Sequence, residues 1–209
     1  MGYFETIMDE TTRDPARAPF LSVTDLTQAA VFAALIAALG LPGTINLSSG
    51  VPITLQSLGV MLAGCVLGPK KGTLAVAIFA VLALVGLPIL AGGRNGWTSL
   101  TSVTGGFFVG FLPAAFIIGL LTALMMPKYR WWLGIVFNVI GGLLVIYTCG
   151  IAGMMIKGMT FDAALSANTS FIAGDVGKAV VASLVAAQVH RGWPGLITPL
   201  GPAGFLRRA

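Results

Sequence analysis

Six mostly apolar stretches run along the chain, separated by short segments that contain glycine, proline or charged residues. A helix needs about 20 mostly apolar residues to cross the hydrocarbon core of a bilayer. Helices are favoured in lipid because they satisfy their own backbone hydrogen bonds. The pattern predicts an all-α bundle of six membrane-spanning helices with ordered loops. The expected spans are Ser22–Leu41, Val51–Gly68, Gly72–Leu90, Gly105–Met126, Trp131–Ile156 and Ser170–His190.

Composition supports a polytopic membrane protein, because 56% of the residues are hydrophobic and only 9% are charged. We expect one membrane domain over residues 22–190. An N-terminal extension over residues 1–21 would precede it, and a basic tail over residues 191–209 would follow. The extension is too acidic to resemble the basic start of a secretory signal.

Basic residues gather in the segments that the six spans place on one side of the membrane. These residues are Arg13, Arg17, Lys70, Lys71, Lys128, Arg130, Arg191, Arg207 and Arg208. The loops on the other side carry only Arg94 and Lys157. The positive-inside bias predicts a multi-pass protein of the cytoplasmic membrane with both termini in the cytoplasm. The same bias explains much of the net charge of +5, so that charge does not indicate nucleic-acid binding.

Motifs of several enzyme classes are absent from the sequence. Gly177-Lys178 is followed by Ala179 and lacks the upstream glycine of a phosphate-binding loop, so we expect no ATP binding by this chain. The H-E-x-x-H and G-x-S-x-G patterns do not occur. Cys65 and Cys149 fall within predicted spans, where a thiol behaves as a small apolar group. We expect no catalytic, metal or cofactor site.

Asp175 and Lys178 lie in the outer half of the last predicted span. A charge in hydrocarbon costs roughly 2.5–3.5 kcal/mol on insertion scales, so such residues usually mark a ligand site or a pathway. Three residues apart, the two side chains share one helix face. Two interpretations remain open, a ligand site and an ion pair that only joins helices.

The third loop, Leu90–Phe107, would face the same compartment. It is too rich in glycine and polar residues for a helix interior, and it contains Arg94. Non-helical backbone at membrane depth is tolerated only where protein covers it or where it lines a cavity. Gln56 and Asn138 add amides, although an interhelical hydrogen bond is the favoured role for Asn138.

Together these groups predict a small outward-facing pocket with one carboxylate, two cations and several amides. An arginine or lysine can hold a ligand carboxylate, and an aspartate can accept hydrogen bonds from ligand N–H groups. We expect its apolar walls to come from Trp97, Phe107, Phe108 and Phe171.

Three segments at this spacing resemble one family. They are Gly92–Gly96, Val103–Phe111 with its Thr-Gly-Gly-Phe-Phe core, and Phe171–Ala179. The chain is similar over about Thr24 to His190 to the BioY family, the biotin-specific S components of energy-coupling factor (ECF) transporters. Val103 and Ala173 stand where that family usually has proline, and neither difference removes a polar group.

The resemblance implies a substrate and a set of binding residues. Biotin has a neutral ureido ring with N–H donors and a carbonyl, an apolar thiophane ring and a valerate carboxylate. Asp175 and Lys178 are expected to hold the ring system, and Arg94 and Asn95 to engage the carboxylate end. The remaining expected binding residues are Gln56, Gly93, Gly96, Thr104, Gly105 and Asn138.

The resemblance also implies partners, namely a transmembrane T component and two cytoplasmic ATPases. The first span carries two rows of alanines four residues apart, Ala29, Ala33, Ala37 and Ala30, Ala34, Ala38. Small residues at this spacing allow close helix approach, either within the bundle or to the T component. An S component for another small solute, a membrane scaffold and an intramembrane enzyme remain as alternatives.

Overall fold

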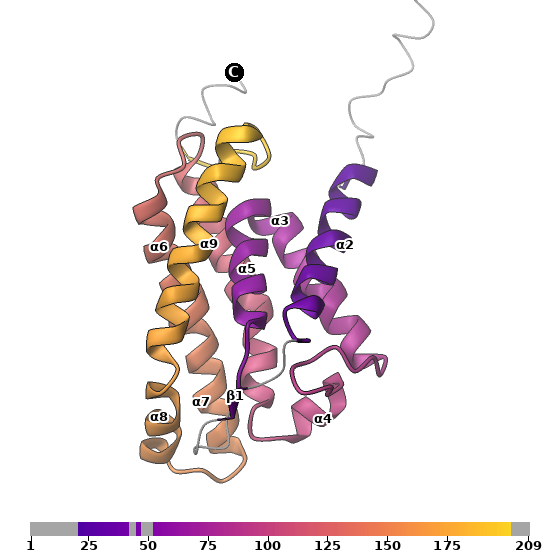
Figure 1. Ribbon diagram of the computed structural model, residues 1–209, viewed down its shortest axis with the longest axis vertical. Helices are drawn as coiled ribbons and strands as arrows, with labels where there is room; N and C mark the ends of the chain where they lie inside the picture. Colours follow the sequence, from indigo (N-terminus) through magenta and orange to yellow (C-terminus); the bar gives the residue numbers. More distant parts are fainter. Residues whose placement is uncertain (1–20, 42–44, 47–51, 202–209) are drawn as a thin grey trace, which may run out of the picture.

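The structure, a computed structural model, describes residues 21–41, 45–46 and 52–201. Almost all of them lie in helices that run side by side in an elongated bundle (Figure 1). The helices are α2 (Val23–Ala38), α3 (Gln56–Leu84), α4 (Gly96–Thr101), α5 (Gly105–Met125), α6 (Trp131–Val139), the π-helical η2 (Ile140–Val145), α7 (Ile146–Ile156), α8 (Phe161–Thr169) and α9 (Ile172–Gly192). Two antiparallel strands of two residues each, β1 (Ile45–Asn46) and β2 (Pro52–Ile53), lie at one end.

Helix α3 is a hairpin with two antiparallel arms, residues 56–67 and 69–84. Gly68 interrupts it with a φ of 79°, a backbone conformation that glycine adopts readily, and Pro69 follows. Gly72 then packs directly on the backbone of Ala63 and Gly64 in the first arm. At the other end, Gln56 hydrogen-bonds to the carbonyl oxygen of Ile89 and the backbone N–H of Ala91. The Gly72 contact at the turn and the Gln56 hydrogen bonds at the opposite end are possible together only if the second arm runs back along the first.

Six helical segments correspond in order to the predicted spans, namely α2, the two arms of α3, α5, the continuous segment α6–η2–α7, and α9. Among the described residues, four helices are long and apolar enough to cross a membrane when α3 is counted as one, and α2 is a shorter apolar helix. The segment α6–η2–α7 covers Trp131–Ile156, as predicted. The start of the second span was predicted five residues too early, since Pro52 and Ile53 belong to β2 and the helix begins at Gln56.

Two short helices were not predicted, and side-chain caps begin both. The third loop was expected to be non-helical throughout, but Asn95 caps α4 by accepting a hydrogen bond from the Thr98 N–H at 2.9 Å. Thr160 caps α8 in the same way through Ala163. Such caps satisfy the free N–H groups of a first turn and allow a short helix inside a polar segment.

The two ends of the bundle differ, and we call them the loop end and the tail end. The loop end carries α4, α8 and the β1–β2 pair, at the bottom of Figure 1. The tail end carries the α3 turn, the start of α2 and residues 193–201. There Lys71 contacts Asp25 at 3.4 Å and donates to the carbonyl oxygen of Leu196. The expected extension over residues 1–20 and the last residues of the tail lie outside the described residues.

Candidate functional site

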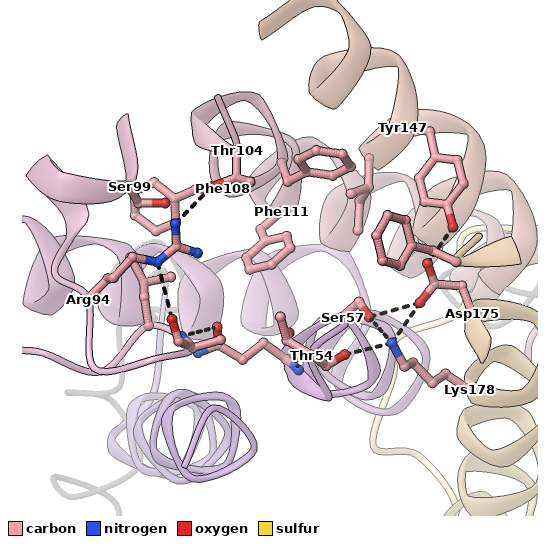
Figure 2. A pocket seen from close by; sticks show the side chains of 16 residues that line it. Thr54, Ser57, Arg94, Ser99, Thr104, Phe108, Phe111, Tyr147, Asp175 and Lys178 are labelled. Atoms are coloured by element: carbon pink, nitrogen blue, oxygen red, sulfur yellow. Dashed lines mark hydrogen bonds and ion pairs between the residues drawn. The ribbon is translucent and has the colours of Figure 1, made fainter. Parts of the chain in front are cut away.

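A cavity opens among the helices at the loop end, with about 670 Å³ of space including its mouth. Its polar lining comes from α9, the start of α3, the third loop and α7, and its apolar lining mainly from α5 (Figure 2). Pockets for small molecules commonly have such mixed walls of apolar and polar groups. Its lining residues are Thr54, Gln56, Ser57, Leu90, Ala91, Arg94, Ser99, Thr104, Phe107, Phe108, Phe111, Ile146, Tyr147, Phe171, Asp175 and Lys178.

Asp175 is the centre of a hydrogen-bonded cluster on one side of this cavity. Its Oδ1 accepts from Lys178 Nζ at 2.7 Å and from Ser57 Oγ at 3.3 Å. Its Oδ2 accepts from the Tyr147 hydroxyl at 2.6 Å. A carboxylate offers about four acceptor positions, so the described residues leave one position on Oδ2 without a donor.

Lys178 uses its three donors within the protein. Besides Asp175, Nζ donates to the Thr54 carbonyl oxygen at 2.6 Å and to Ser57 Oγ at 3.1 Å. The Asp175 and Lys178 side chains are only 9% and 10% exposed, so the pair is neutralised internally. The lysine thereby links the first turns of α9 to Thr54, in the segment that precedes α3.

Arg94 lies on the opposite side of the cavity from that cluster, as Figure 2 shows. Its Nε donates to the Ala91 carbonyl oxygen at 3.2 Å, and an Nη donates to Thr104 Oγ1 at 3.0 Å. Both partners are neutral. Burial lowers the pKa of Arg94 from its usual value, but a guanidinium remains charged at neutral pH. Arg94 is therefore the one cation of the described cavity lining that no described carboxylate neutralises.

Two other predicted site residues, Asn95 and Gln56, use their side-chain amides within the protein. Asn95 caps α4 and does not line the cavity. Gln56 lines it, but its amide is bonded to the backbone of Ile89, Ala91 and, at 3.4 Å, Ile36. Gln56 therefore joins α2, α3 and the third loop.

The predicted glycines shape the third loop. Gly93 has a φ of 69° with open space around it, which permits the turn before Arg94. Gly96 packs on the backbone of Leu84, and Gly105 packs on that of Leu100, so a side chain at either position would collide with main-chain atoms. The glycines position Arg94 and Thr104 and do not line the cavity themselves.

Asn138 lies away from the cavity, in a buried polar cluster between α6 and α9. Its Nδ2 donates to Ser183 Oγ at 3.0 Å, which is the interhelical bond considered as its alternative role. Of the predicted apolar walls, Phe107, Phe108 and Phe171 line the cavity. Trp97 does not line it and is 62% exposed.

Sequence reasoning missed Tyr147 and Ser57, which complete the Asp175 cluster together with the carbonyl oxygen of Thr54. A tyrosine hydroxyl in an apolar span usually finds a polar partner, and this signal was available for Tyr147. The six-residue η2 segment ends just before Ile146 and Tyr147, and π-helical segments often occur at functional sites. The described residues contain no group of three or more His, Cys, Asp or Glu side chains that could hold a metal ion.

Comparisons with known proteins identify relatives of this chain. The chain is 43% identical over 183 residues to a biotin transporter BioY of Rhizobium etli, covering 83% of this chain and 97% of the relative. It is 40% identical to the biotin transporter BioY of Rhodobacter capsulatus, covering 85% and 98%.

A solved structure is also similar, the crystal structure of the S-component for biotin from an ECF-type ABC transporter. It matches with a TM-score of 0.78 and 31% identity, over 82% of this chain and 93% of that one. The BioY family profile matches residues 10–195, nearly the whole chain. The chain belongs to the BioY family.

Proposed function

We propose that this protein takes up biotin across the cytoplasmic membrane, as the high-affinity substrate-binding S component of an ECF-type transporter. Family membership and the likeness to a biotin S component support this function. The observation that carries it is the polarity of the cavity, which has an internally neutralised cluster on one side and an uncompensated arginine on the other.

This polarity suggests how biotin lies in the cavity. The neutral ureido ring would lie at the Asp175 cluster, where the open acceptor position on Oδ2 can take a ligand N–H. The valerate carboxylate would lie at Arg94, since a charge-assisted bond to guanidinium is about twice as strong as a neutral one. The apolar thiophane and chain would pack on Phe107, Phe108 and Phe111 between these two ends.

In this arrangement Lys178 is a positioning residue. Its donors are bound to Thr54, Ser57 and Asp175, so it orients the carboxylate and tethers the segment that enters α3. Ser57 and Tyr147 fix the same carboxylate from α3 and α7. Three helices thus hold Asp175 at the geometry that a rigid bicyclic ligand needs.

The energy for transport would come from partners. A T component and two ATPases would supply ATP hydrolysis, and this chain would carry no catalytic site or cofactor of its own. Release of biotin requires a second state of lower affinity, which the partners would favour. The exposed alanine row of α2, Ala30, Ala34 and Ala38, is a suitable surface for close approach of a T-component helix.

The proposed topology places the tail end in the cytoplasm and the cavity outside. Among the described residues, Lys70, Lys71, Lys128, Arg130 and Arg191 belong to the tail end, and Arg94 and Lys157 to the loop end. This asymmetry is the positive-inside bias expected for such an orientation.

A ligand screen by thermal unfolding tests the proposed function. A ligand that binds only the folded protein stabilises it by RT ln(1 + [L]/Kd), about 2.7 kcal/mol at a hundredfold excess over Kd. We expect biotin to raise the unfolding temperature of the purified chain, and thiamine and riboflavin to leave it unchanged. Stabilisation by another vitamin instead would identify an S component for a different solute. No stabilisation by any of them would favour a scaffold.

A further inference from the structure

A groove lies on the outside of the bundle between α5 and α6, at the tail end and away from the biotin cavity. Apolar side chains of both helices form its walls, including Leu121, Leu124, Leu133 and Phe137. Lys128 and Arg130, from the short connection between the helices, lie at its mouth. In Figure 1, α6 lies at the edge of the bundle beside α9.

The mouth of the groove is positive and lacks an acidic partner in the described part of the chain. Lys128 and Arg130 are exposed, and neither forms an ion pair with a described carboxylate. Asp25, the described acid of this end, is engaged by Lys71. Helix α6 begins at Trp131 without a side-chain cap, so the positive end of its dipole adds to the two cations.

The groove leads from headgroup level into the apolar region. Trp131 and Trp132 are each 50% exposed, and tryptophans of this kind mark the membrane interface. Phe137 lies seven residues beyond Arg130, about 10 Å farther along the helix axis. A molecule that fills the groove therefore needs an anionic head at the interface and an apolar chain below it.

We propose that this groove binds one anionic phospholipid. Its phosphate would contact Lys128 and Arg130, and one acyl chain would lie between Leu124 and Phe137. Basic pockets between helices on the cytoplasmic side attract such headgroups, because each cation near an anionic surface contributes favourably. The acyl chain of a neutral lipid would pack on the apolar walls equally well, but its headgroup would leave the two cations without a counter-charge.

The lipid would also support the tail end. Gly201 contributes to the groove, and the preceding Leu200 donates its N–H to the Ala123 carbonyl oxygen of α5 at 3.0 Å. Ile197 is buried beside Ala123 and Met126 in the same region. A bound lipid would thus contact α5, α6 and the returning tail together.

Native mass spectrometry tests the proposal on the full chain, released from nanodiscs that contain equal parts of phosphatidylglycerol and phosphatidylcholine. We expect the wild type to retain more phosphatidylglycerol than phosphatidylcholine. The double variant Lys128→Gln/Arg130→Gln should lower this retention roughly tenfold. The control Lys157→Gln removes a cation of the loop end and should change nothing. Leu124→Trp, which narrows the groove without changing charge, should also lower retention.

Three results would overturn the proposal. Equal retention of phosphatidylglycerol and phosphatidylcholine by the wild type would show that Lys128 and Arg130 do not favour an anionic headgroup. Displacement of the lipid by inorganic phosphate would indicate a site for a free anion. Protection of Lys128 from chemical modification by a T component, with no lipid retained, would indicate a protein interface. Should the double variant aggregate, the wild-type lipid ratio and Leu124→Trp decide the question.

Discussion

At the scale of single residues, the cavity depends on how the buried Asp175 side chain finds partners in a mostly apolar bundle. An unpaired buried carboxylate costs several kcal/mol, and this one has Lys178, Ser57 and Tyr147 as donors. Among the described residues, these three donors leave one acceptor position of the carboxylate without a partner. In the proposed binding mode, the cluster would combine stability of the fold with a site for a ligand N–H.

Removing the ammonium group of Lys178 should weaken biotin binding more than removing the ammonium group of Lys157. Lys178→Met leaves Asp175 buried without its counter-ion and frees Thr54, so we expect biotin affinity to fall by about tenfold or more. Lys157→Met, on an exposed residue at the same end, should have little effect. A radiolabelled-biotin binding assay on the purified variants measures both, and equal small losses would contradict the proposed role of Lys178.

At the scale of elements, the α3 hairpin determines where the cavity lies. It turns at Gly68 and brings Gln56, at the start of one arm, level with Ile89 and Ala91, beyond the end of the other. This places Arg94 and Ser57 around one space, although they are far apart in sequence. Close packing of the two arms depends on Gly72, which contacts the Ala63 backbone.

Gly72→Ala should destabilise the bundle. The new Cβ would overlap the Ala63 carbonyl oxygen, and backbone has little freedom to yield, so we expect a loss of about 1–3 kcal/mol in the free energy of unfolding. Gly174→Ala is the matched control, since it lies in α9 with open space around it and alanine has the higher helix propensity. Thermal or detergent-induced unfolding compares the two, and equal stability of the variants would argue against tight packing of the hairpin.

At the scale of the whole molecule, α2 faces the bundle with one alanine row and the outside with the other. Ala29 and Ala33 are 0% and 3% exposed and belong to the core, whereas Ala30 and Ala34 are exposed. The spacing of both rows in the sequence fitted packing within the bundle and docking on the T component alike, and the family resemblance favoured docking. The structure gives the first row to internal packing, so the exposed row is the surface available to a T component.

Two neighbouring substitutions separate these roles. Ala33→Trp overfills the contact between α2 and the core, and we expect it to lower stability and biotin binding together. Ala34→Trp changes only the outer surface, so the chain should bind biotin normally while cells that also contain the T component and ATPases lose uptake. Normal uptake by Ala34→Trp would exclude this row as the docking surface.

Six helical segments, the break near Gly68, the charge asymmetry and four residues of the cavity lining could be predicted from the sequence, namely Arg94, Thr104, Asp175 and Lys178. Span length and a charge within an apolar stretch are local properties, so a linear reading detects them. Only the tertiary structure decided which alanine row is buried, that Asn138 pairs with Ser183 and that Tyr147 reaches Asp175. In a membrane, a helix face turned toward lipid is as apolar as one turned toward protein. Hydropathy therefore indicates which segments cross the bilayer but not how each helix is rotated, and rotation decides which side chains meet.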